Sequence, residues 1–326
     1  MKFGLHLDAS INRSATSIIS QWQKLVSIAD ASGFDYVSVV DHLVPFPNFG
    51  PNFGPNFGPN FGPNFGPNFK PIDTPLFDPW QLLTAFATQT KSVTLLTLVS
   101  NASISHPTRL AKQASTLDII SQGRMMLGLG AGGYEADDSA LGINRRSQKE
   151  RIARLDERAD ILRMLWTGGE TSYQGRWHSL DCYTSSPPPL GEPRLLIAGK
   201  SKPVLRIAAH RASACNFAFT DSTELKILIA QFEDILELTT KTLDDIEVTL
   251  LDRVFIGASN EDANRAWQDA GAPTVKGHPG IIGGAELLVE NITKLEEVGA
   301  DTLFLMFNNL EALQRFSTDV VSQFQK

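Results

Sequence analysis

The chain has 326 residues, of which 42% are apolar, and a formal net charge of −7 at pH 7. This length suits one large domain or two ordinary ones, and α/β barrels routinely exceed the usual domain size. Acidic and basic residues are interspersed without a basic run, which argues against nucleic acid or an anionic membrane surface as a partner. Cys182 and Cys215 have no paired spacing, so neither a disulfide framework nor a cysteine zinc site is expected. No apolar run suits a membrane span or a signal peptide, and we expect a cytoplasmic protein.

Short β-rich runs alternate with segments of helical period along nearly the whole chain. Strands are predicted at 2–7, 34–40, 92–100, 124–130, 194–199, 214–219, 246–257 and 301–307. Helices are predicted at 16–31, 80–89, 108–121, 149–166, 202–211, 222–239, 284–298 and 309–323. Strands that alternate with helices call for parallel pairing and right-handed crossovers. An open doubly wound sheet and a closed barrel both satisfy this rule, and the count of eight strands favours a single α/β (β/α)8 TIM barrel.

Three long segments interrupt this order: 42–77 after strand two, 131–148 after strand four and 167–193 before strand five. We interpret them as loops on the face where barrel enzymes place functional loops. Within the third, residues 171–181 predict a small hairpin that turns at Gln174-Gly175.

Residues 47–70 consist of five Pro-Asn-Phe-Gly units and a sixth that ends in Lys70. Proline and glycine at this spacing disfavour a helix and a central strand. We therefore expect a weakly ordered insertion in the loop after strand two of a single domain that spans residues 1–326.

Polar side chains follow the first four predicted strands and would meet at one mouth of a parallel barrel. They are His6, Asp8, Asp41, His42, Ser100, Asn101, Tyr134 and Glu135. His42 suits a proton donor or acceptor, because the unperturbed pKa of histidine lies near neutrality. The equally weighted alternative is that Asp41 caps a turn while His42 packs in the end of the barrel.

A glycine-rich stretch, Gly128 to Gly133, has the spacing of a dinucleotide fingerprint. That motif should open a helix directly and be followed by an acid at the end of a later strand, and neither feature is evident. A glycine-rich loop that lets the backbone approach a ligand is therefore favoured.

A second stretch predicts an anion site between a strand and a helix. Its residues are Gly199, Lys200, Ser201 and Lys202. Exposed N–H groups and the helix dipole both favour phosphate there. An ordinary loop capped by Ser201 is the alternative. The six histidines lack metal-ligand spacing and no G-x-S-x-G elbow is present, so an organic cofactor is favoured over metal or serine chemistry.

The segments GFDYVSVVDHL, HPTRLAKQASTLDIISQGRMMLGLGAG, RLDERADILRMLW and TSYQGRWHSL resemble the bacterial luciferase-like monooxygenase superfamily. Within it, the chain is most similar to oxidoreductases that use the deazaflavin coenzyme F-420. The resemblance implies a TIM barrel that binds its cofactor at the carboxyl-terminal mouth, with His42 beside the ring as the catalytic proton carrier. It also implies a non-prolyl cis peptide bond, Leu98–Val99, behind the ring. The implied cofactor-binding residues are Asp41, Leu98, Val99, Ser100, Gly132, Gly133, Tyr134, Gly199, Lys200, Ser201 and Lys202.

The implied reaction is hydride transfer between a small organic substrate and the deazaflavin, with no metal. An FMN-dependent monooxygenase served by a partner flavin reductase is the first alternative, and a non-catalytic flavin-binding protein is the second. A nicotinamide dehydrogenase is more distant. Relatives are often homodimers. One departure stands out: sugar-phosphate dehydrogenases of this group have a catalytic Glu soon after strand four, whereas Glu135 is displaced, so that acid role is not carried over.

Overall fold

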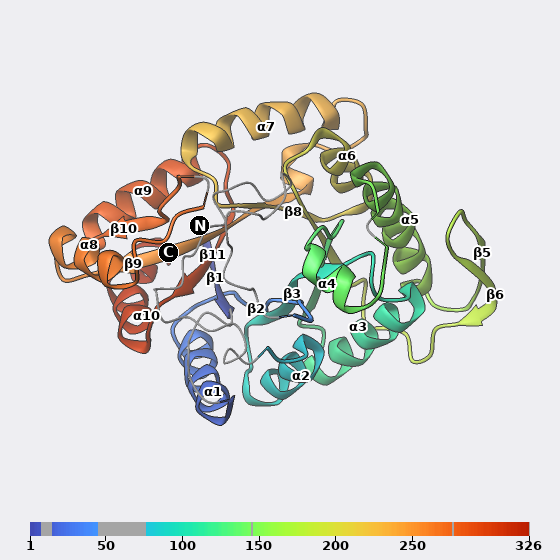
Figure 1. Ribbon diagram of the computed structural model, residues 1–326, viewed down its shortest axis with the longest axis horizontal. Coiled ribbons are helices and arrows are strands. Elements are labelled where there is room, and N and C mark those ends of the chain that lie inside the picture. Colours follow the sequence, from blue (N-terminus) through green and yellow to red (C-terminus); the bar gives the residue numbers. More distant parts are fainter. Residues whose placement is uncertain (8–14, 45–75, 145, 276, 326) are drawn as a thin grey trace.

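The computed structural model describes residues 1–7, 15–44, 76–144, 146–275 and 277–325. Among these, eight parallel strands form a closed barrel inside a ring of helices (Figure 1). In order around the barrel they are β1 (Lys2–Leu7), β2 (Tyr36–Val39), β3 (Thr94–Asn101), β4 (Met125–Gly130), β7 (Arg194–Ala198), β8 (Ala214–Ala218), β9 (Glu247–Ile256) and β11 (Thr302–Phe307). Because β11 pairs with β1, the sheet has no open edge between them. The predicted TIM barrel is confirmed, and the doubly wound alternative is wrong.

The main helices lie between these strands. They are α1 (Ala15–Ala31), α2 (Pro79–Gln89), α3 (Pro107–Ser121), α4 (Glu135–Ala140), α5 (Gln148–Trp166), α6 (Lys202–Arg211), α7 (Ser222–Leu236), α8 (Asn260–Asp269), α9 (Ala285–Glu297) and α10 (Leu310–Phe316). After α10 the chain continues as a π-helical turn, Ser317–Val321, and a last turn, Ser322–Phe324. None of the described helices is both long and apolar enough to cross a membrane.

Three short elements were not predicted: α4, α8 and β10 (Ile281–Gly283), which pairs with β9. Helix α8 buries only Ala263, so it lacks the apolar stripe from which a helix is located in a sequence. Helix α4 has only six residues, too few to show a helical period.

Alternate residues along each strand face two different cores. Residues that point outward, such as Leu5 and Val37, pack against the helices. The interior of the barrel is filled by a second cluster, which includes Leu96, Met126 and Phe304. The barrel is therefore a packed core rather than a pore, and a ligand must bind at its ends.

A charged network lies at the amino-terminal end of the barrel. Glu247 accepts hydrogen bonds from the Tyr36 hydroxyl at 2.9 and 3.0 Å and from Thr302 Oγ1 at 2.5 Å, and it pairs with Arg194. Burial alone would raise the pKa of Glu247, but the bonds from Thr302 and Arg194 outweigh burial and lower it. The contacts of this carboxylate are structural. The candidate functional residues lie at the opposite, carboxyl-terminal end of the barrel.

The predicted hairpin is formed by β5 (Glu170–Gln174) and β6 (Ser179–Thr184), which pair antiparallel and project at the right of Figure 1. The segment 167–193 follows helix α5 and precedes β7, so its interpretation as a loop after a strand is wrong. The repeat at 47–70 and Asp8 lie outside the described residues.

Candidate functional site at the carboxyl-terminal mouth

His42 follows the end of β2 by three residues and is held by a buried carboxylate. Its Nδ1 atom donates a hydrogen bond to Asp137 Oδ2 at 2.7 Å. The His42 side chain is 26% exposed, whereas that of Asp137 is 0% exposed. The ring packs edge-on against Tyr134, with 5.0 Å between the ring centroids. One face and one nitrogen of His42 are thus fixed while part of the ring still reaches solvent.

Asp137 also fixes the backbone that carries His42. Its Oδ1 atom accepts the N–H groups of Leu43 and Val44, each at 3.0 Å. Asp137 lies in the first turn of α4, where the helix dipole favours a negative charge. An acceptor at Nδ1 sets the neutral tautomer of a histidine, so the neutral His42 ring carries its proton on Nδ1 and not on Nε2.

Asp137 was missed by the sequence analysis. The available signal was the acidic run Glu135-Ala-Asp137-Asp138, which is typical of the start of a helix. The prediction that no helix opens directly after the glycine stretch is also wrong, because α4 begins at Glu135.

Asp41 joins the ends of β2 and β3. Its Oδ2 atom accepts a hydrogen bond from Ser100 Oγ at 2.5 Å, and Ser100 Oγ lies 3.0 Å from Thr97 Oγ1. Burial raises the pKa of the Asp41 carboxyl, and the bond from Ser100 opposes part of that increase. The contact places Asp41 and Ser100 together, as the resemblance implies, with Asp41 oriented by the neighbouring strand.

The peptide bond between Leu98 and Val99 is cis and non-prolyl, which confirms the expectation for this position. It falls where the pairing of β3 with β4 shifts register, between Thr97 and Ser100. A Cβ atom added at Gly130 would lie 2.7 Å from a methyl group of Val99. The side chain of Val99 therefore depends on a glycine in the neighbouring strand.

The loop after β4 packs closely on the end of β3. Gly132 has a φ of 72°, and a Cβ atom there would lie 2.2 Å from Asn101 Oδ1. Only glycine suits both the backbone angle and this contact. Tyr134 is buried, and burial followed by the charge of Asp137 raises the pKa of its phenol. Gly128 and Gly130 lie within β4, so only the end of the glycine stretch belongs to this close-packed loop, which brings Tyr134 to His42.

The segment 199–202 lies at the start of α6, as predicted. Gly199 has a φ of 143°, and Ser201 occupies the capping position but its side chain makes no capping hydrogen bond. The alternative placed Ser201 correctly at the N-cap of α6, but its side chain does not make the capping bond. Lys200 Nζ lies 2.9 Å from Glu224 Oε2 and 3.2 Å from the Phe219 carbonyl oxygen, so its charge is shared with an acid.

The remaining predicted positions divide into two groups. His6 lies inside the barrel, where its Nδ1 is 2.9 Å from Ser38 Oγ. His106, at the start of α3, accepts the Thr108 N–H through its side chain and so caps that helix. Among the described residues, no group of three or more His, Cys, Asp or Glu side chains is placed to hold a metal ion.

A closed parallel barrel with an anchored histidine at its carboxyl-terminal mouth defines the class of (β/α)8 barrel enzymes. A family model described as luciferase-like monooxygenase matches residues 1–305. The chain belongs to this family. Its curated relatives are dehydrogenases and monooxygenases, and the enzyme class is accordingly that of the oxidoreductases.

Two curated relatives and one solved structure illustrate the similarity. An F-420-dependent glucose-6-phosphate dehydrogenase of Nakamurella multipartita is 28% identical over 255 residues, which cover 77% of this chain and 67% of that protein. An FMNH(2)-dependent dimethylsulfone monooxygenase of Pseudomonas fluorescens is 28% identical over 129 residues, 40% of this chain and 35% of that protein. The F-420-dependent tetrahydromethanopterin reductase of Methanopyrus kandleri has a TM-score of 0.77 at 16% identity and covers 99% of both chains, which shows a shared fold.

Proposed function

We propose that the protein transfers hydride between a small organic substrate and the deazaflavin coenzyme F-420. The observation that carries this proposal is the extent of similarity to F-420-dependent glucose-6-phosphate dehydrogenase, 255 residues, against 194 residues for a pyrimidine monooxygenase of Variovorax paradoxus and 129 residues for the FMNH(2)-dependent monooxygenase. Glucose 6-phosphate itself is not proposed as the substrate, because Glu135 does not stand where that group has its acid.

The residues at the mouth fit a ring with a phosphate-bearing tail. Gly132 brings backbone rather than a side chain to the loop after β4, where it packs on the end of β3. At the start of α6, Ser201 makes no side-chain capping bond. Pro203 has no N–H group and the Val204 N–H donates to the Ser201 carbonyl oxygen at 2.8 Å, so an oxyanion there would use the N–H groups of Ser201 and Lys202. We assign the ring to the first place and the phosphate to the second, with Lys202 adding positive charge.

The chain itself contributes orientation and control of one proton. When bound, the deazaflavin supplies a ring carbon that accepts or donates hydride. Asp137 holds Nδ1 of His42, and Nε2 of His42 then takes or returns the proton that accompanies oxidation or reduction of the substrate. Two side chains line the site and limit the access of water: Asp41, which Ser100 positions, and the buried Tyr134.

An FMN-dependent monooxygenase is the second candidate, favoured by the similarity to the FMNH(2)-dependent enzyme. It would require reduced flavin from a reductase partner.

Titration of the purified apoprotein with F-420 and with FMN, followed by fluorescence, separates the two candidates. We expect tighter binding of F-420, and tight binding of FMN with none of F-420 would overturn the choice. A His42→Ala variant should retain coenzyme affinity while losing turnover, and unchanged turnover would exclude the role of His42.

A further inference from the structure

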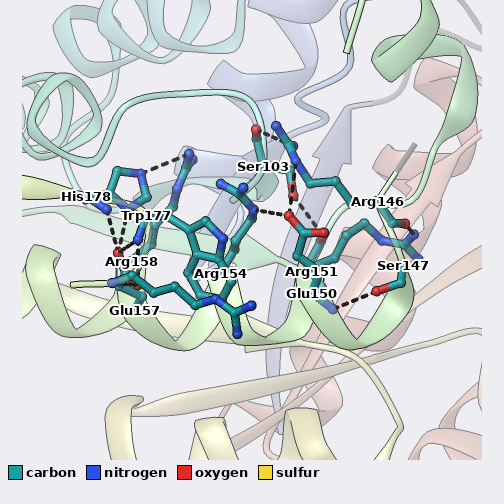
Figure 2. Close-up of polar contacts among 12 residues, drawn as sticks. Ser103, Arg146, Ser147, Glu150, Arg151, Arg154, Glu157, Arg158, Trp177 and His178 are labelled. Carbon is teal, nitrogen blue, oxygen red and sulfur yellow. Dashed lines mark hydrogen bonds and ion pairs between the residues drawn. The ribbon is translucent and has the colours of Figure 1, made fainter. Parts of the chain in front are cut away.

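Three arginines of α5 and one that precedes the helix form what we call the α5 arginine row (Figure 2). They are Arg146, Arg151, Arg154 and Arg158. The last three are spaced by three and four residues, so they share one face of the helix. Arg151 and Arg158 are 6% and 4% exposed, which is unusual for a residue that cannot give up its charge.

The buried arginines are incompletely partnered. Nε and Nη1 of Arg158 and Nε of Arg151 are buried with no hydrogen-bond acceptor. Burial, reinforced by the charges of Arg154 and Arg146, lowers the pKa of Arg158 to about 10. The same side chains are partly bonded, since Arg151 Nη1 donates to the Arg146 carbonyl at 2.8 Å and Arg158 Nη2 lies 3.5 Å from His178 Nε2. A buried donor that lacks an acceptor is destabilising, so the remaining N–H groups suit an acceptor from outside the chain, a bound water or an anion.

The nearby carboxylates do not supply it. Glu157 accepts the backbone N–H groups of Arg176, Trp177 and His178, and it also bonds His178 Nδ1 at 2.9 Å. Both oxygens of Glu157 are thus committed to the hairpin turn (Figure 2).

Glu150 is likewise engaged by the row itself. Its Oε1 atom lies 2.9 Å from Arg154 Nε and 3.8 Å from Arg146 Nε. In the described part of the chain, Glu150 therefore forms ion pairs with Arg146 and Arg154, whereas Arg151 and Arg158 have no carboxylate ion pair.

We propose that the α5 arginine row binds a polyvalent oxyanion, a phosphate or polycarboxylate group, beside the mouth of the barrel. Guanidinium groups bind such oxyanions in pairs of hydrogen bonds, which matches the unused donors. The row begins at the mouth: Arg146 Nη1 donates to the Ser103 carbonyl at 3.1 Å, and a Cβ atom added at Gly133 would lie 3.3 Å from Arg151 Nη2. The anion is thus either the tail of the cofactor or a charged group of the substrate, and only this choice rests on the proposed function.

The first test uses pyrophosphate and needs no activity. At matched ionic strength against chloride, saturating pyrophosphate should raise the melting temperature of the wild-type protein by roughly 2–5 °C. The Arg158→Met variant removes a buried, unpaired charge, so in chloride it should melt at or above the wild-type temperature, and it should lose the pyrophosphate shift. A matched control on the same helix is Arg163→Met, whose exposed guanidinium donates to the His210 carbonyl at 3.2 Å; it should keep the shift.

A second variant keeps the test valid if Arg158→Met does not fold. Arg154 lies at a partly exposed position, 17% by side chain, and Arg154→Gln should weaken pyrophosphate binding about tenfold. The proposal is overturned if pyrophosphate gives the wild type no shift beyond chloride, or if Arg158→Met and Arg154→Gln both keep the full shift.

A comparison of FMN with riboflavin identifies the source of the anion, because the two differ by one phosphate. Loss of the preference for FMN in Arg158→Met would assign the anion to the phosphate of the cofactor, which the row would then hold in place of the start of α6. A retained preference together with a lost pyrophosphate shift would assign it to the substrate, and both results support the row as an anion site. If neither flavin nor F-420 binds, the proposed function fails while the pyrophosphate result still decides the anion site.

Discussion

Asp137→Asn tests whether one buried carboxylate sets the state of His42. The substitution preserves size and removes the charge that receives His42 Nδ1 at 2.7 Å and the Leu43 and Val44 N–H groups at 3.0 Å. An asparagine oxygen can still accept the two backbone bonds. Its NH2 group then faces His42 Nδ1, which must become an acceptor, so the proton of the neutral ring moves to Nε2.

The cost in stability follows from the same contacts. A hydrogen bond to a charged group contributes about 1.5–3 kcal/mol and a neutral one about 0.5–1.5 kcal/mol, so two weakened backbone bonds should cost about 2–3 kcal/mol. Urea unfolding measures this loss. Imidazole 15N shifts of the six histidines, with His42 assigned from His42→Ala, report the tautomer directly. An exposed aspartate on α7, Asp234, provides the control Asp234→Asn. An unchanged tautomer with a loss below about 0.5 kcal/mol would refute the role of Asp137.

Three further predictions concern the rim and the repeat. Ser100→Ala removes the hydroxyl that donates to the Asp41 carboxylate, so the free energy of unfolding should fall by about 1–3 kcal/mol at pH 7. The loss should be smaller below the ordinary aspartate pKa of 3.8, because Asp41 is then protonated. An equal loss at both pH values would contradict this prediction. Asp252 Oδ2 bonds His278 Nε2 at 2.6 Å and raises the pKa of His278 above 6.5. That stabilisation is complete below pH 6.5 and is lost as the pH rises through the raised value, so His278→Gln should lower the urea midpoint more at pH 6 than at pH 9. Deletion of 51–66, four whole repeat units outside the described residues, should leave coenzyme affinity unchanged, and a tenfold loss would show that the repeat takes part in binding.

The barrel was predictable because its signals are local and repeated. Strands such as β4 and β9 are apolar runs between turn-forming residues, and α5 shows a helical period, so order and parallel pairing follow from the sequence. Helix α8 gave no such signal, because Ala263 is its one buried residue and no apolar stripe runs along it.

The site was predictable only in part. Position at a strand end identified Asp41 and His42, and the family resemblance identified the cis bond at Leu98–Val99, which composition and periodicity do not encode. Asp137 is 95 residues from His42 in the chain, and such a contact is created by closure of the barrel rather than by a local pattern. The same holds for the unpartnered atoms of Arg158, since burial of an arginine is a property of the folded state.

The identity of the bound coenzyme decides whether the protein uses the deazaflavin F-420 or FMN. The protein should be purified from a host that makes both F-420 and FMN, and its absorption spectrum and released ligand should be recorded. We expect coenzyme F-420 to copurify with the wild-type protein and with His42→Ala alike, because His42 carries a proton and does not anchor the ligand. Recovery of FMN alone would contradict the deazaflavin assignment and favour the monooxygenase.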